Sequence, residues 1–169
     1  AMKALELFVE RVILASRWIL VVFYLGLAAA LAVYAVSFGV KFLKIAKTAL
    51  TASEAEMILS MLSLIDAALV ASLVVMVMLA SYENFVSRFD DAKTDLTWLG
   101  KLDAGSLKIK VASAIVAISS IHLLQVFLNA NQYDNQKILW LTVIHIAFVV
   151  SALVLGILEW IQAQTKKVG

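Results

Sequence analysis

Four long apolar stretches limit what this chain of 169 residues can fold into. They cover residues 18–40, 57–82, 111–133 and 138–158. Crossing the hydrocarbon core of a membrane takes about 20 helical residues, because a helix rises about 1.5 Å per residue. Strands of a membrane barrel would alternate apolar and polar side chains, whereas these stretches are apolar all round. The sequence therefore predicts an all-α fold, an integral membrane four-helix bundle that forms one domain over residues 1–169.

Composition supports a membrane protein and excludes several kinds of function. The chain is 63% hydrophobic and only 15% charged, which leaves too little polar surface for a soluble globule. It has no Cys, so disulfides, thiolate nucleophiles and Cys-ligated metal clusters are excluded. A net charge of +2 does not indicate nucleic-acid binding. The chain also lacks the sequence motifs of serine hydrolases, zinc proteases and nucleotide-binding enzymes, so we predict no enzyme and no resident cofactor.

The distribution of Lys and Arg predicts the orientation in the membrane. Ten of them lie in the N-terminal segment, the connection 83–110 and the C-terminus, against four on the other side (Lys41, Lys44, Lys47 and Lys137). Cytoplasmic loops carry the excess of positive charge. Both termini and the connection 83–110 are therefore predicted to be cytoplasmic, in a bacterial inner membrane. The connection is expected to form amphipathic segments that could contact a cytoplasmic protein or anionic lipid.

The segments beside the apolar stretches predict local structure. Residues 2–17 mix charged and apolar side chains, which fits either an amphipathic helix on the membrane surface or a first helix that starts early. Residues 53–56 read Ser-Glu-Ala-Glu, the pattern of a capping box before the second span. Residues 129–137 are short and polar, which predicts a tight hairpin between the third and fourth helices.

Pairs of small residues four positions apart mark faces where membrane helices can approach closely. The chain has such a pair in each span: Gly26 with Ala30, Ala67 with Ala71, Ser113 with Ala117, and Ala152 with Gly156. These pairs predict helix packing but leave open whether the partner is a helix of the same chain or of a second subunit.

Three ionisable residues lie inside the apolar stretches. Counted at about 1.5 Å per residue from the predicted outer ends, Asp66, His122 and His145 lie about 13, 10 and 12 Å deep. Insertion of a carboxylate near the bilayer centre costs about 2.5 to 3.5 kcal/mol, so it needs compensating partners. We therefore predict an intramembrane polar cluster made of Asp66, His122, His145, Ser63, Ser119 and Gln125.

Four interpretations of this cluster remain open. The Asp could bind a proton or cation while the His residues exchange protons, since an imidazole titrates near neutral pH. Asp66, His122 and His145 could instead ligate a metal, or the two His residues a haem. The remaining interpretation is a buried network that determines helix register without transporting anything.

A second group of charged and polar residues is predicted at the inner membrane boundary. It comprises Arg17, Glu83, Asn84, Lys108, Lys110 and Glu159. Arg17 could pair with Glu83 or Glu159 at a pore end or a headgroup site. Alternatively, these side chains simply extend to the interface with the headgroups.

Several sequence blocks resemble the YqhA-like family of small bacterial inner-membrane proteins. They are Ala15-Ser16-Arg17-Trp18, Leu62-Ser63-Leu64-Ile65-Asp66, Val75-Met76-Val77-Met78, Tyr82 to Ser87, Trp98-Leu99-Gly100-Lys101 and Ile115 to Leu124. The resemblance covers nearly the whole chain, and the block from Ile118 to Leu124 is specific. It implies location and helix count but no activity, since that family is uncharacterised. Residues matching the family pattern are Arg17, Asp66, Glu83, Asn84, Ser119, Ser120 and His122, together with Lys108, Lys110 and His145.

The resulting functional hypothesis is proton or cation permeation, or proton-coupled transport, through the Asp/His cluster. Four helices are few for a monomeric transporter, so we expect a homo-oligomer with a path along its axis. The alternative is a non-transporting module that organises the membrane or contacts lipids and proteins. Metal or haem binding ranks third.

Overall fold

The computed structural model describes residues 2–85 and 104–168, with side chains placed for 2–82 and 107–168. The elements in chain order are α1 (Met2–Thr48), α2 (Glu54–Phe85), α3 (Ala104–Leu128), the short 3-10 helix η2 (Ala130–Gln132) and α4 (Asn135–Val168). All four α-helices are long and apolar enough to cross a membrane. The predicted all-α architecture with four spanning helices is confirmed.

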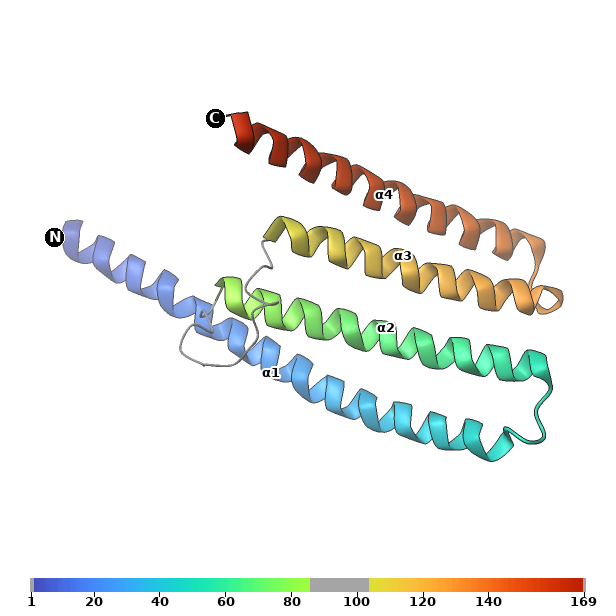
Figure 1. Cartoon of the computed structure of the whole chain (residues 1–169). Helices are drawn as coiled ribbons and strands as arrows, with labels where there is room; N and C mark the ends of the chain where they lie inside the picture. Colours follow the sequence, from blue (N-terminus) through green and yellow to red (C-terminus); the bar gives the residue numbers. More distant parts are fainter. Residues whose placement is uncertain (1, 86–103, 169) are drawn as a thin grey trace.

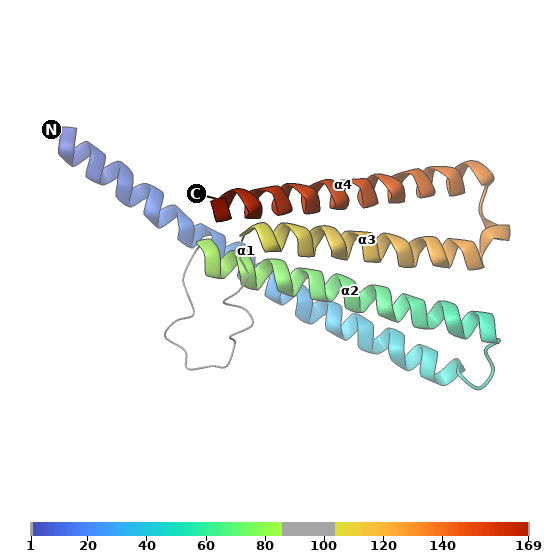
Figure 2. The ribbon, with the colours of Figure 1, turned by 45° about the horizontal axis from the view of Figure 1, so that its top comes forward.

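The four helices lie side by side in chain order (Figures 1 and 2). Extensive packing joins α1 to α2, α2 to α3 and α3 to α4. Helices α1 and α4 form opposite edges of this row, whereas a closed bundle would also pack them against each other (Figure 1). Each middle helix therefore has two helical neighbours and each edge helix only one.

Burial follows this arrangement. The buried apolar residues of the described chain are Leu62, Ala67, Ala80 and Val126, all on α2 or α3. No residue of α1 or α4 is buried. The packed interior is thus a thin layer between the middle helices, and most apolar side chains point outward, as expected where the surrounding solvent is lipid.

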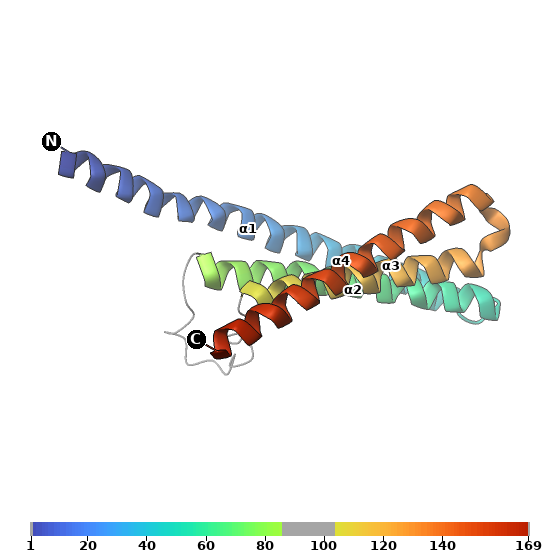
Figure 3. The same ribbon diagram turned by 90° about the horizontal axis from the view of Figure 1, so that it is seen from above.

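Helix α1 is much longer than a membrane crossing requires. Its 47 residues extend about 70 Å, compared with a hydrocarbon core of about 30 Å. Residues 2–17, which we name the stem, continue the helix beyond its neighbours (Figures 1 and 3). The helix has no break between the stem and the span. Of the two predictions for this segment, the structure shows a first helix that starts early.

The helix ends agree with the polar signals in the sequence. The Ser53 backbone N–H donates to Glu56 Oε2 at 2.8 Å, and the Glu56 N–H donates to Ser53 Oγ at 3.3 Å, which confirms the capping box. The hairpin between α3 and α4 is also confirmed. The third predicted span ran to residue 133, however, and α3 ends at Leu128. The short 3-10 helix η2 follows instead, in which the backbone N–H groups of Gln132 and Tyr133 donate to the carbonyl oxygens of Asn129 and Ala130.

Both termini lie at the same end of the row (Figures 1 and 2). We name this the terminal end, and the opposite end, with residues 49–53 and 129–134, the hairpin end. Four crossings of a membrane would return the chain to the side on which it started, which agrees with both termini lying at the same end of the row. The prediction of amphipathic segments in the connection 83–110 falls mostly on residues 86–103, outside the described residues.

Candidate functional site

A carboxylate and an imidazole from neighbouring helices meet inside the apolar layer. Asp66 on α2 and His122 on α3 place Oδ1 and Nδ1 3.6 Å apart. The Asp66 side chain is 22% exposed and that of His122 59% exposed. Asp66 Oδ1 itself is buried and has no hydrogen-bond partner within bonding distance. The imidazole is thus the nearest group able to compensate this oxygen, at a distance slightly too long for a hydrogen bond.

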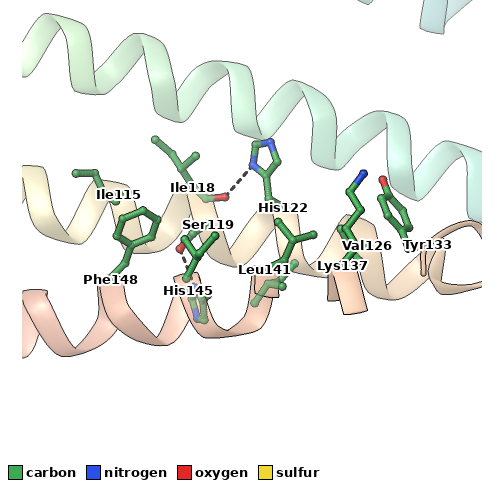
Figure 4. Close-up of a pocket in the computed structure, with 12 residues that line it drawn as sticks. Ile115, Ile118, Ser119, His122, Val126, Tyr133, Lys137, Leu141, His145 and Phe148 are labelled. Carbon is green, nitrogen blue, oxygen red and sulfur yellow. Dashed lines mark hydrogen bonds between the residues drawn. The ribbon is translucent and has the colours of Figure 1, made fainter. Parts of the chain in front are cut away.

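The contacts of His122 indicate which ring nitrogen carries a proton. Nδ1 also lies 3.2 Å from the carbonyl oxygen of Ile118, one turn earlier on α3 (Figure 4). A carbonyl oxygen only accepts hydrogen bonds, so Nδ1 must carry the hydrogen in this geometry. Because more than half of this side chain is exposed, the other ring nitrogen, Nε2, can contact water or a neighbouring subunit.

The second histidine contacts a hydroxyl instead of an acid. His145 Nδ1 on α4 lies 2.7 Å from Ser119 Oγ on α3. Ser119 Oγ donates to the carbonyl oxygen of Val116 at 3.0 Å, so the imidazole N–H donates to the hydroxyl. These two hydrogen bonds connect His145 on α4 to the backbone of α3 through the Ser119 hydroxyl. They satisfy both side chains without a charged group.

The two pairs point to different sides of α3, although His122 also borders the groove that Ser119 and His145 line. Figure 4 shows His122 directed towards α2, while Ser119 and His145 meet between α3 and α4. Within residues 2–82 and 107–168, no three His, Asp or Glu side chains are grouped so that they could hold a metal ion. Asp66, His122 and His145 therefore do not form the predicted three-ligand set. Both histidines border the same groove between α3 and α4, and haem binding by the two stays a prediction.

One groove between α3 and α4 is lined by Ser119, His145 and also His122. The groove has a volume of about 440 Å³ and mostly apolar walls, including Ile118, Leu141 and Phe148. At the hairpin end it reaches Lys137, whose Nζ lies 5.1 Å from the centre of the Tyr133 ring. Sequence reasoning missed Lys137 and Tyr133 as neighbours of the site. Their position in the polar hairpin was the available signal.

A third predicted cluster residue, Ser63, lines a different space. A groove of about 360 Å³ between α1 and α2 at the hairpin end is bordered by Lys41, Lys44, Thr48, Ser60 and Ser63. Ser63 precedes Asp66 by one helical turn. The polar lining of this groove thus comes within one turn of Asp66 along α2, although Asp66 itself does not border it. Gln125 is half buried on α3, and no hydrogen bond among the described side chains joins it to either pair.

The predicted group at the inner boundary is dispersed. Arg17 lies on the stem with its guanidinium carbon 5.7 Å from the Trp18 ring centre, while Glu159 belongs to the opposite edge helix. The two form no ion pair, because the row separates α1 from α4. Lys108 borders an apolar groove between α3 and α4, and Lys110 is exposed. The side chains of Glu83 and Asn84 lie outside those described.

A serine hydroxyl beside an imidazole invites comparison with a nucleophile and its base. Acyl transfer also needs donors aimed at the developing oxyanion. Here Ser119 and His145 lie within long helices, whose backbone N–H groups donate to carbonyls four residues earlier. We therefore assign no acyl-transfer chemistry to this pair. The pair with both a titratable base and a titratable acid is Asp66 with His122.

Comparison with known proteins agrees with the resemblance seen in the sequence. The model of an uncharacterized protein family, UPF0114, matches residues 13–127, which is more than half of the chain. The matched range contains Asp66, Ser119 and His122 but ends before His145. No solved structure matches the fold. Together with four helices of membrane-spanning length, the match shows that this multi-pass membrane protein belongs to the UPF0114 family.

Proposed function

We propose that this protein moves protons or cations into or across a bacterial inner membrane, with the Asp66 and His122 pair as the binding site. One observation carries the proposal: a buried carboxylate oxygen without a hydrogen-bond partner lies 3.6 Å from an uncovered imidazole. An ionisable pair in a membrane helix is energetically expensive and usually marks an ion pathway. An imidazole ring can both accept and donate a proton, which a proton path requires.

Access from the hairpin end supports this assignment. Ser60 and Ser63 line the groove at this end, and Ser63 precedes Asp66 by one turn of α2. The two lysines of the groove, Lys41 and Lys44, would repel any cation, so the preference depends on the pair itself, where an imidazole able to hold a proton lies beside the carboxylate. We therefore favour protons over other ions.

The proposed orientation follows from the charge distribution. The terminal end, which carries most of the Lys and Arg, would face the cytoplasm, and the groove at the hairpin end would face the periplasm. The protein would work as a homo-oligomer, because one row of four helices covers so little of its own apolar and polar surface. Lipid and, through residues 83–110, a cytoplasmic partner would cover the rest.

Proton flux into proteoliposomes tests the proposal. Purified full-length protein is reconstituted with an internal pH-sensitive dye, and flux is driven by a potassium diffusion potential. Asp66→Asn and His122→Ala should each reduce proton flux by about tenfold or more, equivalent to about 1.4 kcal/mol in the barrier. His145→Ala is the matched control, since it changes an imidazole outside the pair, and should retain most of the flux. Unmutated protein that stays at the level of empty liposomes would refute the proposal.

A second candidate is a non-transporting module that organises the membrane or binds lipids and proteins. The observation favouring it is the apolar character of α2 between Asp66 and the terminal end, where residues 73–80 read Leu-Val-Val-Met-Val-Met-Leu-Ala. A proton released from Asp66 towards that end meets no polar side chain in this segment. If flux is absent while both pairs still contribute to stability, this second function is the correct one.

A further inference from the structure

The uncovered side of α1 carries a continuous seam. It consists of residues separated alternately by four and three positions: Leu5, Val9, Val12, Ser16, Ile19, Phe23, Gly26, Ala30 and Val33. All nine are exposed. The side of α1 that packs on α2 is a different one, formed by half-buried residues such as Leu27, Leu31 and Tyr34. The seam is therefore free to contact another molecule.

The spacing of the seam is that of a left-handed coiled coil. A repeat of seven residues keeps the same positions on one line when two helices wind around each other. The pattern persists over four repeats, through both the stem and the span. None of the charged residues of the stem lies on the seam. They are Lys3, Glu6, Glu10, Arg11 and Arg17. The seam side of the stem thus carries no charge, whereas apolar residues on the other side, such as Leu7 and Leu14, lie next to charged residues one turn away.

Lipid alone cannot cover this seam along its whole length. Within the bilayer, lipid tails solvate apolar side chains. The stem, however, continues α1 beyond the neighbouring helices, and α1 is longer than a bilayer including its headgroups, about 40–45 Å (Figures 1 and 3). Lying flat on the membrane would require a bend between stem and span, and α1 is one unbroken helix in a chain without Pro. In water, the seam residues of the stem would remain exposed.

A parallel α1 from a second copy covers the whole seam at once. It has the same length, and its own stem stands at the same height. Gly26 and Ala30 then lie where the two helices cross the membrane, and a Cβ added to Gly26 would meet no atom of its own chain within 4 Å. Small residues at such a position let two backbones approach closely. We propose that α1 is the interface between two copies of this chain, which pair in parallel along the seam from Leu5 to Val33.

This proposal deepens the homo-oligomer of the proposed function but does not depend on proton binding. Inside the membrane, the seam is made of aliphatic, aromatic and small residues, so it holds subunits together and conducts nothing. The pairs on α3 lie elsewhere in the row. Cross-linking and flux therefore report on separate claims, and either can fail alone.

Cysteine cross-linking tests the interface cleanly, because the chain has no native Cys. Val12→Cys lies on the seam, and Leu14→Cys is a matched control on the other side of α1. Their side chains are equally exposed, at 53% and 54%. A disulfide forms only when the two Cα atoms come within about 4.4–6.8 Å. Mild oxidation of the full-length protein in native membranes should give several-fold more covalent dimer for Val12→Cys. Equal dimer at both positions, or none at either, would overturn the proposal.

A second variant pair tests the membrane part of the seam. Gly26→Leu in the Val12→Cys background should reduce covalent dimer several-fold, because the larger side chain prevents close approach. Ala28→Leu adds a comparable side chain on the other side of α1 and should leave the dimer unchanged. The space around Gly26 means that the substitution does not strain the single chain. Undiminished cross-linking in Gly26→Leu would show that the seam is not the contact.

Discussion

Both histidines of this protein involve helix α3, His122 as one of its residues and His145 as a contact from α4. Their polar partners nevertheless differ. His122 lies beside a carboxylate, with Nδ1 3.6 Å from Asp66 Oδ1, and more than half of its side chain is uncovered. His145 instead contacts the hydroxyl of Ser119 at 2.7 Å, and both histidines border the apolar groove between α3 and α4. One pair combines an acid with a base, and the other has no acid.

This difference comes from the position of α3 in the row. Ser119 and His122 are three residues apart, which is about 60° around a helix of 3.6 residues per turn. In a helix with one packed face, both would share a neighbour. Here α3 packs against α2 on one side and against α4 on the other. A difference of 60° in direction is therefore enough to give Ser119 and His122 different partners. A polar stripe on a middle helix therefore need not be one site.

Loss of the imidazole next to the acid should have the largest effect on stability. His122→Leu leaves the buried Asp66 oxygen without its nearest compensating group, which should cost about 1–3 kcal/mol of unfolding free energy. Reversible unfolding of the protein in mixed micelles measures this. The double variant Asp66→Leu/His122→Leu should recover most of the loss, since no buried polar atom is then orphaned. A double variant less stable than the single one would show that the pair itself is not what matters.

Coupling energies should distinguish the two pairs next. A double-mutant cycle between Asp66 and His122 should give an interaction energy of about 0.5–3 kcal/mol, as for residues in contact. The same cycle between Asp66 and His145 should close within about 0.5 kcal/mol, as for independent sites. Comparable coupling in both cycles would restore the single cluster predicted from depth alone.

The hydroxyl contact should contribute least. Ser119→Ala removes the acceptor of the His145 N–H and should destabilise the fold by about 0.6 kcal/mol, the average for hydrogen bonds between membrane helices. Ser120→Ala is a suitable control, because Ser120 Oγ donates to the carbonyl oxygen of Val116 within its own helix. Proton flux should be the same in both variants. A Ser119→Ala protein without flux would move the candidate site to the α4 side.

Much of the fold could be predicted because it depends on local chemistry. The spans follow from length and hydropathy, and the capping box of Ser53 and Glu56 depends on residues three apart. The exception is the end of α3 at Leu128, where the 3-10 helix η2 follows in place of further α-helix. The relation between Arg17 and Glu159 could not be predicted, because it depends on which helices form the edges of the row.

The amino-acid order alone determined that four helices are long and apolar enough to cross a membrane, and that an acid and two imidazoles lie within them. Both follow from transfer free energies, which depend on the residues and their spacing along one helix. Which imidazole meets the acid was decided only by tertiary packing. That choice depends on which neighbour each face of α3 contacts, and rotating α3 by one residue's spacing would change it without altering any hydropathy.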